Sequence, residues 1–566
     1  MSMQVSIGAY SNAGVKTRNE DSYGVMFPEE NQSITKGVAI AIADGMSTCP
    51  NAKEASETCI KCFLLDYFST PNSWGVKKSV GKILNATNSW MYSQSQNQQS
   101  VELGMVSTLS AMVIKGGKAH IFHVGDSRIS LIRDGSIEPL TQDHILKDFT
   151  GHSFLNRAMG TSIHLDMDYK TVPLRQDDIL IFTTDGVHEY INPSKLKNLI
   201  VNGLHDLDIT ARIIVDVALE AGSQDNVTCQ IVKIDDLAND YDPTSLSVGN
   251  LPFPPLLENG QILDGYKIIR EIHANSRSQV YLAQQAGSDD YVAIKTPSVN
   301  FEDDPVYISA FKREEWIGAQ INEPHIVKYL PAAADKQFLY MVIEYIEGQT
   351  LREWIDNHPN PDLSEVKEIV LQIITAIRSL HRQDMVHRDL KPDNVMIDRS
   401  GMIKLIDLGS VHVASLDEEN DSQDDTQLLG SVDYTAPEYL LQGKASRATD
   451  LYSLGVILYE MLTHKLPYGR GFKNSYDVKR LKYISALSVN KELPAWLEVI
   501  LQKATAKDTD ERYERFSELQ YELTKPKHEI YTQAKESLLQ RNPVRFWKAT
   551  SAILVTIIVL MLILGE

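Results

Sequence analysis

Cysteine is scarce in this chain: the 566 residues include only Cys49, Cys59, Cys62 and Cys229. Four cysteines are too few for a fold held together by disulfides, and they favour a reducing compartment. Cys59 and Cys62 have the spacing of a redox or zinc motif, but no second Cys or His pair completes a set of four ligands. We therefore interpret them as two thiols on a helix within residues 52–68.

Positive charge is also in deficit, with 55 Lys and Arg against 75 Asp and Glu and a net charge of −20. A field of that sign repels phosphate backbones, so we expect no nucleic acid among the partners. The first residues lack the charged and long apolar stretches of a signal peptide, and we expect none. The hydrophobic fraction of 43% is ordinary for a folded protein, so large cores are available.

Composition changes along the chain and predicts its domains. Residues 1–235 contain apolar runs at 38–43, 119–124 and 179–182, which we predict to be strands buried on both faces. Residues 236–260 are rich in aspartate and then in proline, which is typical of a linker. A second domain follows over residues 261–525, rich in strand patterns as far as Leu351 and in helical patterns beyond it.

The last part of the chain is the most apolar. Residues 546–564 would form a helix about 28 Å long at about 1.5 Å per residue, close to the hydrocarbon thickness of a bilayer. Residues 526–545 before it contain Arg541 and Arg545, so we predict a juxtamembrane segment and a single membrane-spanning helix, with the catalytic domains on the cytoplasmic side of the cell inner membrane. The alternative is a terminal helix docked on the second domain, but such a helix should keep a polar face.

The second domain contains the tract His-Arg-Asp-Leu-Lys-Pro-Asp-Asn at 387–394, followed by Asp407-Leu408-Gly409. Phosphoryl transfer from ATP needs a carboxylate to orient the attacking hydroxyl and a lysine to neutralise the moving phosphate. It also needs an amide and a second carboxylate that hold Mg²⁺. Asp389, Lys391, Asn394 and Asp407 occur in that order, which predicts an ATP-dependent phosphotransferase.

Residues 266–523 resemble the Hanks-type (eukaryotic-like) serine/threonine protein kinases, and the resemblance implies a bilobal fold. It identifies Lys295, in Val-Ala-Ile-Lys, as the ATP-phosphate lysine and Glu314 as its helix partner, with Glu315 as the alternative. Glu344, in Ile-Glu-Tyr, matches the segment that contacts adenine.

The same resemblance assigns the roles of the tract at 387–394. Asp389 matches the catalytic base and Lys391 the lysine that contacts the phosphate. Asn394 and Asp407 match the Mg²⁺ ligands. Ala-Pro-Glu at 436–438 matches the end of the activation segment, whose glutamate pairs with Arg512; Asp450 matches a second buried charge of the helical lobe.

One departure concerns the loop over the ATP phosphates, which contains no glycine. His273, Asn275 and Ser278 stand at the three glycine positions, with Ile272 and Val280 beside them as further expected nucleotide contacts. Glycine permits close approach to phosphate and positive φ. Two interpretations stay open: an active kinase with an unusual loop, or a pseudokinase that serves as a nucleotide-binding or scaffold module. The retained base, lysine and metal ligands favour the active kinase.

The first domain has its own series of acidic motifs. Hard Mg²⁺ or Mn²⁺ ions prefer carboxylate oxygens, carbonyls and water. Two such ions about 3.5–4 Å apart can activate a shared water for attack on phosphorus. The candidate ligands, in chain order, are Glu20, Asp21, Asp44, Gly45, Asp126, Asp185 and Asp225.

Residues 5–234 resemble the metal-dependent PPM (PP2C-type) serine/threonine phosphatases, which implies an α-β-β-α sandwich and two or three Mn²⁺ or Mg²⁺ ions. By this resemblance Asp44 bridges two ions, the Gly45 carbonyl binds one of them, and Asp185 and Asp225 supply further carboxylates.

Other positions match the family less closely. Glu20 and Asp21 match outer, partly water-mediated ligands, and Asp126 a residue near a third ion. Lys16 stands where relatives have an arginine that contacts phosphate, and lysine lacks its bidentate fork. Met46 stands near the position of a proposed general acid and cannot donate a proton, so water would have to protonate the leaving group.

The sequence therefore predicts an α+β multidomain signalling enzyme, of bacterial type, that phosphorylates protein Ser and Thr and also hydrolyses phosphoserine and phosphothreonine. Its expected cofactors are ATP with Mg²⁺ for the kinase and Mn²⁺ or Mg²⁺ for the phosphatase. Its expected partners are protein substrates and a membrane. Whether the phosphatase acts on its own kinase domain or on shared substrates stays open, as does the oligomeric state.

Overall fold

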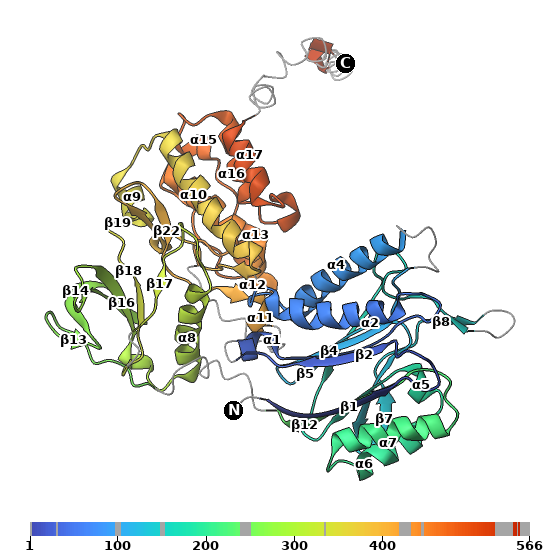
Figure 1. The fold of residues 1–566 in the computed structure, drawn as a ribbon. Helices are drawn as coiled ribbons and strands as arrows, with labels where there is room; N and C mark the ends of the chain where they lie inside the picture. The colour runs from blue at the N-terminus through green and yellow to red at the C-terminus, as the bar shows by residue number, and fades with distance from the viewer. Residues whose placement is uncertain are drawn as a thin grey trace. The chain divides into compact units, whose positions relative to one another are not determined.

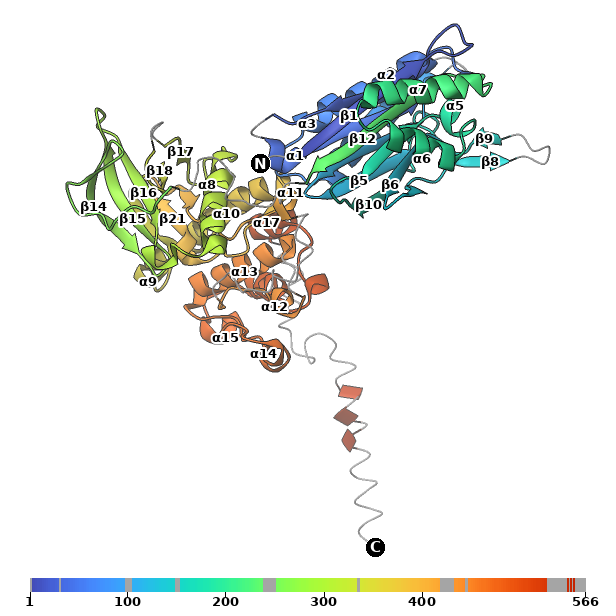
Figure 2. The ribbon, with the colours of Figure 1, turned by 90° about the horizontal axis from the view of Figure 1, so that it is seen from below.

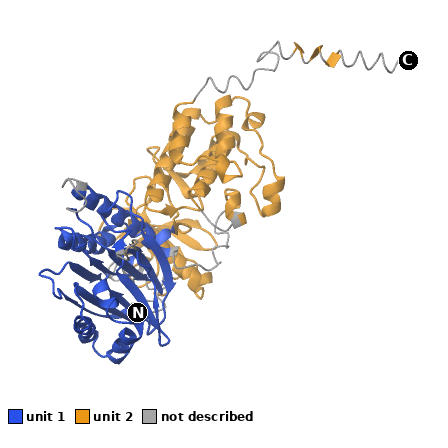
Figure 3. Ribbon diagram, turned by 90° about the vertical axis from the view of Figure 1, so that its right-hand side faces the viewer, with its two compact units in different colours: residues 1–242, 413–421 blue, residues 243–412, 422–566 orange. Residues whose placement is uncertain are grey.

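The computed structural model (Figure 1 and, from below, Figure 2) describes residues 3–29, 32–96, 104–147, 153–237, 251–332, 336–417, 432–442 and 446–526, with six residues between 547 and 554. The chain divides into two compact units. The first comprises residues 1–242 and 413–421, and the second residues 243–412 and 422–566 (Figure 3).

In the first unit, two antiparallel five-stranded sheets are stacked between helices (Figure 1). One sheet has the order β1 (Gln4–Asn12), β12 (Val227–Asp236), β11 (Ile179–Thr183), β6 (Arg128–Arg133) and β7 (Ser136–Pro139). The other has the order β10 (Asp168–Pro173), β5 (Lys118–Val124), β4 (Leu109–Lys115), β3 (Val38–Asp44) and β2 (Asp21–Met26). The helices are α2 (Ala52–Lys61) and α4 (Val76–Gln96) on one side, and α6 (Pro193–Asn202) and α7 (Leu207–Glu220) on the other. This is the predicted α-β-β-α sandwich.

The three predicted buried strands are β3, β5 and β11, within a residue or so at each end. Along β3, Ile40 and Ile42 lie in the apolar cluster between the sheets, whereas Ala41 and Ala43 lie in the cluster beneath α2 and α4. Alternate side chains of a strand point to opposite faces, so a continuous apolar run is stable here because both faces are covered. Each fully buried isoleucine contributes about 1.5–3 kcal/mol.

The two neighbouring cysteines lie on helical backbone, as predicted. Cys59 is in α2, and Cys62 begins a π-helical turn (Cys62–Asp66) that continues into α3 (Tyr67–Ser69). Both are free thiols, and Cys59 is buried against Met91.

The second unit begins with a six-stranded antiparallel sheet and one helix, α8 (Pro305–Ala319). Its strand order is β13 (Ile262–Leu263), β14 (Tyr266–Ala274), β15 (Ser278–Gln285), β16 (Tyr291–Pro297), β18 (Met341–Glu344) and β17 (Tyr329–Leu330). The change to helices occurs where it was predicted, because α9 begins at Leu351.

The rest of this unit is largely helical (Figure 2). Its helices are α9 (Leu351–Asn357), α10 (Leu363–Arg382), α12 (Pro437–Gln442), α13 (Arg447–Thr463), α14 (Ser475–Arg480), α15 (Ala486–Val489), α16 (Ala495–Ala504) and α17 (Phe516–Thr524). In a small sheet of β19 (Gly348–Thr350), β21 (Val395–Asp398) and β22 (Ile403–Leu405), the predicted ATP-site tract at 387–394 runs directly into β21, and Asp407 lies two residues after β22.

Parts of the predicted linker and of the C-terminal segments fall outside the described residues. Of the predicted linker, residues 251–257 pack on the second unit, where Phe253 is buried and the Leu339 N–H donates to the Pro252 carbonyl at 2.9 Å. The predicted juxtamembrane segment is outside the described residues from 527 on, as is most of 546–564. Within the described part of the chain, no helix has both the length and the apolar character needed to cross a membrane.

Candidate active sites

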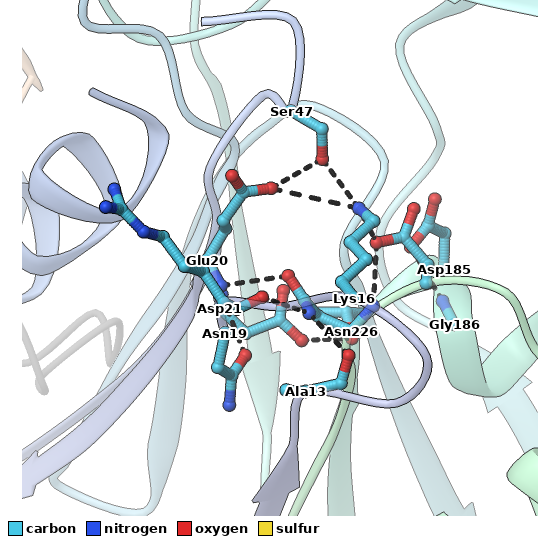
Figure 4. A network of polar contacts seen from close by, with 12 residues as sticks. Ala13, Lys16, Asn19, Glu20, Asp21, Ser47, Asp185, Gly186 and Asn226 are labelled. Atoms are coloured by element: carbon cyan, nitrogen blue, oxygen red, sulfur yellow. Dashed lines mark hydrogen bonds and ion pairs between the residues drawn. The ribbon is translucent and has the colours of Figure 1, made fainter. Parts of the chain in front are cut away.

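The acidic residues predicted in the first unit lie where strands begin or end. Asp44 is the last residue of β3 and pairs in register with Asp21, the first residue of β2. Asp185 begins the short helix α5 (Asp185–His188) after β11, and Asp225 lies two residues before β12. The two sheets thereby bring residues that are far apart in sequence to one end of the sandwich (Figure 4).

Asp21 is held by one oxygen and leaves the other without a partner. Its Oδ2 accepts hydrogen bonds from the hydroxyls of Thr184 at 3.0 Å and Thr228 at 2.6 Å, while its buried Oδ1 has none. Burial raises the pKa of Asp21 to about 6 against the lowering effect of these bonds. A buried carboxylate oxygen with no donor is a place where a cation would be favourable.

The carboxylates of this end act on one another. Burial, followed by the charges of Asp21, Asp185, Asp225 and Asp126, holds the pKa of Asp44 well above its usual range. Burial and then Asp126 and Asp225 raise the pKa of Asp185 to about 7. Among the described residues, no three His, Cys, Asp or Glu side chains are grouped as ligands of a metal ion in this arrangement. The cluster nevertheless holds more buried negative charge than protein cations balance, so its chemistry fits hard divalent ions.

Lys16 is the cation that the protein itself supplies at this end. Its ammonium pairs with Asp225 Oδ1, donates to Ser47 Oγ at 2.6 Å and lies 3.8 Å from Glu20 Oε2 (Figure 4). Burial alone would lower the pKa of Lys16, but the bond to Asp225 and the surrounding carboxylates raise it. Lys16 therefore pairs with two of the predicted metal ligands.

Two of the acidic residues, Asp44 and Asp126, lie next to positions that require glycine, Gly45 and Gly125. A Cβ at Gly45 would lie 2.1 Å from the Ala52 carbonyl oxygen, so only glycine fits between Asp44 and the start of α2. Gly125, before Asp126, has a φ of +112° and lies against Thr108. Burial, with the charge of Asp143, raises the pKa of Asp126 to about 6.

Asn226 and the two threonines that hold Asp21 were not given roles in the sequence analysis. The Asn226 side chain accepts from the Glu20 N–H and donates to the carbonyls of Ala13 and Arg18, at 2.8–2.9 Å (Figure 4). It thereby fixes the segment that carries Lys16 and Glu20. In the sequence, only the position of Asn226 next to Asp225 could have indicated this role.

In the second unit, Lys295 on β16 and Glu314 on α8 form a buried pair. The Lys295 ammonium lies 2.6 and 2.8 Å from the two Glu314 oxygens and 3.5 Å from Asp407 Oδ1. Burial would lower the pKa of Lys295, but the charges of Asp407 and Glu314 raise it. Burial would raise the pKa of Asp407, but it lies at about 2, chiefly because of the charge of Lys295. Glu315, the alternative partner, instead pairs with Lys336 at 3.1 Å.

Tyr329 on β17 was not foreseen from the sequence. Its hydroxyl donates to Glu314 Oε1 at 3.0 Å, so the carboxylate is fixed from a second side.

The tract at 387–394 forms a compact loop. Lys391 donates to Asp389 Oδ2 at 2.7 Å, and the Asn394 amide donates to the Asp389 carbonyl at 2.8 Å. The Ile406 N–H donates to the Asn394 carbonyl at 3.0 Å, which places Asn394 next to Asp407. The predicted base, lysine and two metal ligands are thus brought together.

Buried carboxylates anchor this loop and the end of the activation segment. The Asp450 carboxylate accepts from the N–H groups of His387 and Arg388 at 2.9 and 3.0 Å. Arg512 and Glu438 form a bidentate pair with both distances 2.7 Å.

The predicted adenine segment and phosphate loop lie on the sheet of the second unit. Glu344 Oε1 accepts from Lys404 at 2.6 Å and from the Lys328 N–H at 2.7 Å, so this carboxylate joins β18 to β22. In the loop, Val280 pairs in register with both His273 and Lys295.

Of the other predicted loop contacts, Ile272 is exposed at the end of β14, and Ser278 is buried at the start of β15. Asn275 lies in the turn between these strands. The five predicted loop residues therefore surround one turn next to the strand that carries the lysine.

Comparison with known proteins identifies both domains. Residues 10–232 match the family model described as Protein phosphatase 2C, and residues 266–525 match the model described as Protein kinase domain. The chain therefore contains a phosphatase 2C domain followed by a protein kinase domain, as the motifs predicted.

Individual relatives resemble one domain each. The serine/threonine-protein kinase PrkC of Bacillus subtilis (strain 168) is 34% identical over 270 residues, which cover 47% of this chain and 41% of PrkC. The crystal structure of the Mycobacterium tuberculosis serine/threonine phosphatase PstP/Ppp aligns with 22% identity over 41% of this chain and 99% of that one, at a TM-score of 0.35. That of the PknI kinase domain from the same organism aligns with 23% identity, 48% and 98% coverage, and a TM-score of 0.38. This chain spans less than half the length of curated relatives that it matches, such as PrkC.

Proposed function

We propose that this protein is a bifunctional signalling enzyme. Its second unit transfers the γ-phosphoryl group of ATP to Ser and Thr hydroxyls of proteins, and its first unit hydrolyses phosphoserine and phosphothreonine. The observation that carries the kinase proposal is the buried Lys295–Glu314 pair beside Asp407. The observation that carries the phosphatase proposal is the coupled acidic cluster around Asp44.

In the kinase, each residue has a defined task. Asp389 orients the substrate hydroxyl and takes its proton, and Lys391, 2.7 Å away, offsets the charge on the moving phosphoryl group. Lys295 is kept charged by its carboxylate partners and binds the ATP phosphates. Asn394 and Asp407 would hold Mg²⁺, which would neutralise charge on the β- and γ-phosphates.

In the phosphatase, the carboxylates of Asp44, Asp185 and Asp225 would hold two Mn²⁺ or Mg²⁺ ions, with Glu20 and Asp126 available to outer or third positions. Bound ions activate water for in-line attack on phosphorus. Lys16, which pairs with Asp225 and Glu20, could contact the phosphate instead once these carboxylates bind metal ions. Because Met46, the residue after Gly45, has no acidic proton to donate, water would protonate the leaving alkoxide oxygen.

The glycine-free phosphate loop supports one rival proposal, a pseudokinase that binds nucleotide without transfer. The two proposals differ in turnover alone. Mg²⁺-dependent ATP binding with no labelled protein product would support the rival.

The C-terminal apolar run supports a further part of the proposal, a single-pass anchor in the cell inner membrane with both catalytic domains in the cytoplasm. Fractionation of cells that produce the full chain tests it. Recovery in the membrane fraction after a high-salt wash is expected, and release by salt would contradict it.

One experiment tests both activities. The full chain is incubated with [γ-³²P]ATP and casein, with and without Mn²⁺, next to Asp389→Asn and Asp44→Asn. We expect Asp389→Asn to abolish transfer and Asp44→Asn to preserve labelled phosphate. Matched controls are Asp393→Asn, whose side chain is 56% exposed, and Asp134→Asn, whose side chain is 83% exposed; neither should change either activity.

The same experiment addresses self-reversal. If the phosphatase acts on its own kinase domain, Asp44→Asn raises the phosphate on that domain. An unchanged level would restrict the phosphatase to other substrates.

A further inference from the structure

The loop between β14 and β15 lacks glycine but is closed by one of its own side chains. Asn275 Oδ1 accepts hydrogen bonds from the N–H groups of Arg277 and Ser278, both at 2.8 Å. The Asn275 N–H donates to the Ser278 carbonyl at 3.0 Å. An asparagine side chain can stabilise a tight turn in this way, where glycine would otherwise supply the conformational freedom.

The tip of this loop is also tied to α8. The Tyr307 hydroxyl donates to the carbonyl oxygen of Arg277 and accepts from the Ser298 N–H at 3.2 Å. The Ser298 N–H also lies 2.9 Å from the same Arg277 carbonyl. One backbone carbonyl of the loop is therefore held by a helix side chain and by the residue that follows β16.

Tyr307 shares a face of α8 with the glutamate that pairs with Lys295. Tyr307, Phe311 and Glu314 have the spacing i, i+4, i+7, which places them in one row about two turns long. Phe311 is buried, and its ring lies 6.5 Å from that of Tyr307. The helix face that orients Lys295 thus also holds the phosphate loop.

The tyrosine ring is itself well supported. It stacks on Phe301, with centroids 4.8 Å apart, and lies 6.5 Å from Phe253 of the predicted linker. Burial raises the pKa of the Tyr307 phenol, so it stays protonated and able to donate at neutral pH.

We propose that Tyr307 is a positioning residue for the ATP phosphates: its hydroxyl fixes the glycine-free loop, whose turn is formed by Asn275, to the helix that places Glu314 against Lys295. The loop is then in position over the phosphates when that ion pair is formed. This proposal rests on the proposed ATP-binding function of the kinase domain.

The test is the affinity of the full chain for MgATP and for adenosine, measured by calorimetry in mild detergent. Tyr307→Phe removes the hydroxyl and keeps the ring. We expect MgATP to bind about fivefold more weakly, since one hydrogen bond contributes about 1 kcal/mol. Adenosine, which has no phosphates, should bind as before. In the transfer assay, KM for ATP should rise while kcat changes less than twofold.

Two further variants complete the design. Tyr291→Phe is the matched control, because Tyr291 is 52% exposed on neighbouring β16; its MgATP affinity should be unchanged. Asn275→Ala removes the exposed side chain that forms the turn of the loop, and it should weaken the binding of MgATP but not of adenosine. It therefore tests the loop's part in the proposal even if Tyr307→Phe unfolds.

The outcomes distinguish the positioning role of Tyr307 from the proposed kinase function. Equal MgATP affinities for Tyr307→Phe and Tyr291→Phe, or an equal loss for MgATP and adenosine, would overturn the positioning role. An unmodified chain that binds no MgATP at all would instead overturn the proposed kinase function.

Discussion

Replacing Glu314 by glutamine tests the ion pair on which the kinase proposal rests. Glu314 is 4% exposed and contacts Lys295 through both oxygens. Glu314→Gln keeps the shape of the side chain and an oxygen that can accept from Tyr329. It removes the charge, and Lys295 keeps only Asp407, at 3.5 Å.

The size of the effect follows from the burial of the pair. Removing one partner of a buried ion pair typically costs about 3–5 kcal/mol. Because Asp407 still balances part of the lysine charge, and because the hydrogen bond of Tyr329 is kept, we take the lower end. A loss of about 3 kcal/mol in transition-state stabilisation corresponds to a fall in kcat/KM of about 150-fold.

The adjacent glutamate provides the control. Glu315 pairs with Lys336 at 3.1 Å, and its side chain is 33% exposed. Pairs at a partly exposed position contribute at most about 1 kcal/mol, and this pair does not contact Lys295. Glu315→Gln should therefore leave kcat/KM within about twofold of the unmodified chain, in a casein assay with [γ-³²P]ATP.

Either of two results would contradict the role assigned to Glu314, provided that the unmodified chain is active. One is a fall of less than tenfold for Glu314→Gln. The other is a larger loss for Glu315→Gln, which would mean that the neighbouring glutamate is the functional partner.

Three other predictions concern stability and positioning. Arg512→Met leaves Glu438 buried without its ion-pair partner, so chemical denaturation should show a loss of about 3–5 kcal/mol in the free energy of unfolding. Arg515→Met, at a side chain that is 74% exposed, should change this free energy little. Similar losses for the two variants would contradict the assignment. Burial lowers the pKa of His120 to about 4, so the unfolded chain takes up a proton first and stability falls as pH drops from about 6.5 to 4, by about 3 kcal/mol. Urea unfolding of His120→Gln should lose this contribution of His120 to the pH dependence of stability, and an unchanged pH profile would refute it. Asn226→Ala releases the loop that its side chain ties at three points and should lower phosphatase kcat at least tenfold with p-nitrophenyl phosphate, while kinase activity stays unchanged; a selective rise in KM would argue against a positioning role.

Local patterns predicted much of the fold. The run at 38–43 is apolar at every position, which is stable only where both faces are covered, and β3 occupies such a position. Asp44 and Asp185 follow runs of this kind. A predicted strand at 38–43 or 179–182 therefore also places the aspartate that follows it at a strand end, as the structure shows.

Contacts over long sequence distances were not predictable in the same way. Thr184 and Thr228, which donate hydrogen bonds to Asp21, lie 163 and 207 residues from it, and no motif assigned a role to either hydroxyl. Isolated hydroxyl groups of this kind have no periodic or spacing signal. Asn275 and Tyr307 are similar: Asn275 was predicted as a replaced glycine and a nucleotide contact, not as the residue that forms the turn, and Tyr307 was unremarkable.

Residue order was sufficient to predict two phosphate chemistries, because each motif is a short tract whose internal spacing is set by local backbone geometry. Only the tertiary structure brings the separate tracts of each site together. Packing alone decided which of two adjacent glutamates on α8 contacts Lys295, because the rotation of that helix against β16 depends on its whole buried face. Packing also decided how a loop without glycine is held, since its support comes from a helix side chain thirty residues further along the chain.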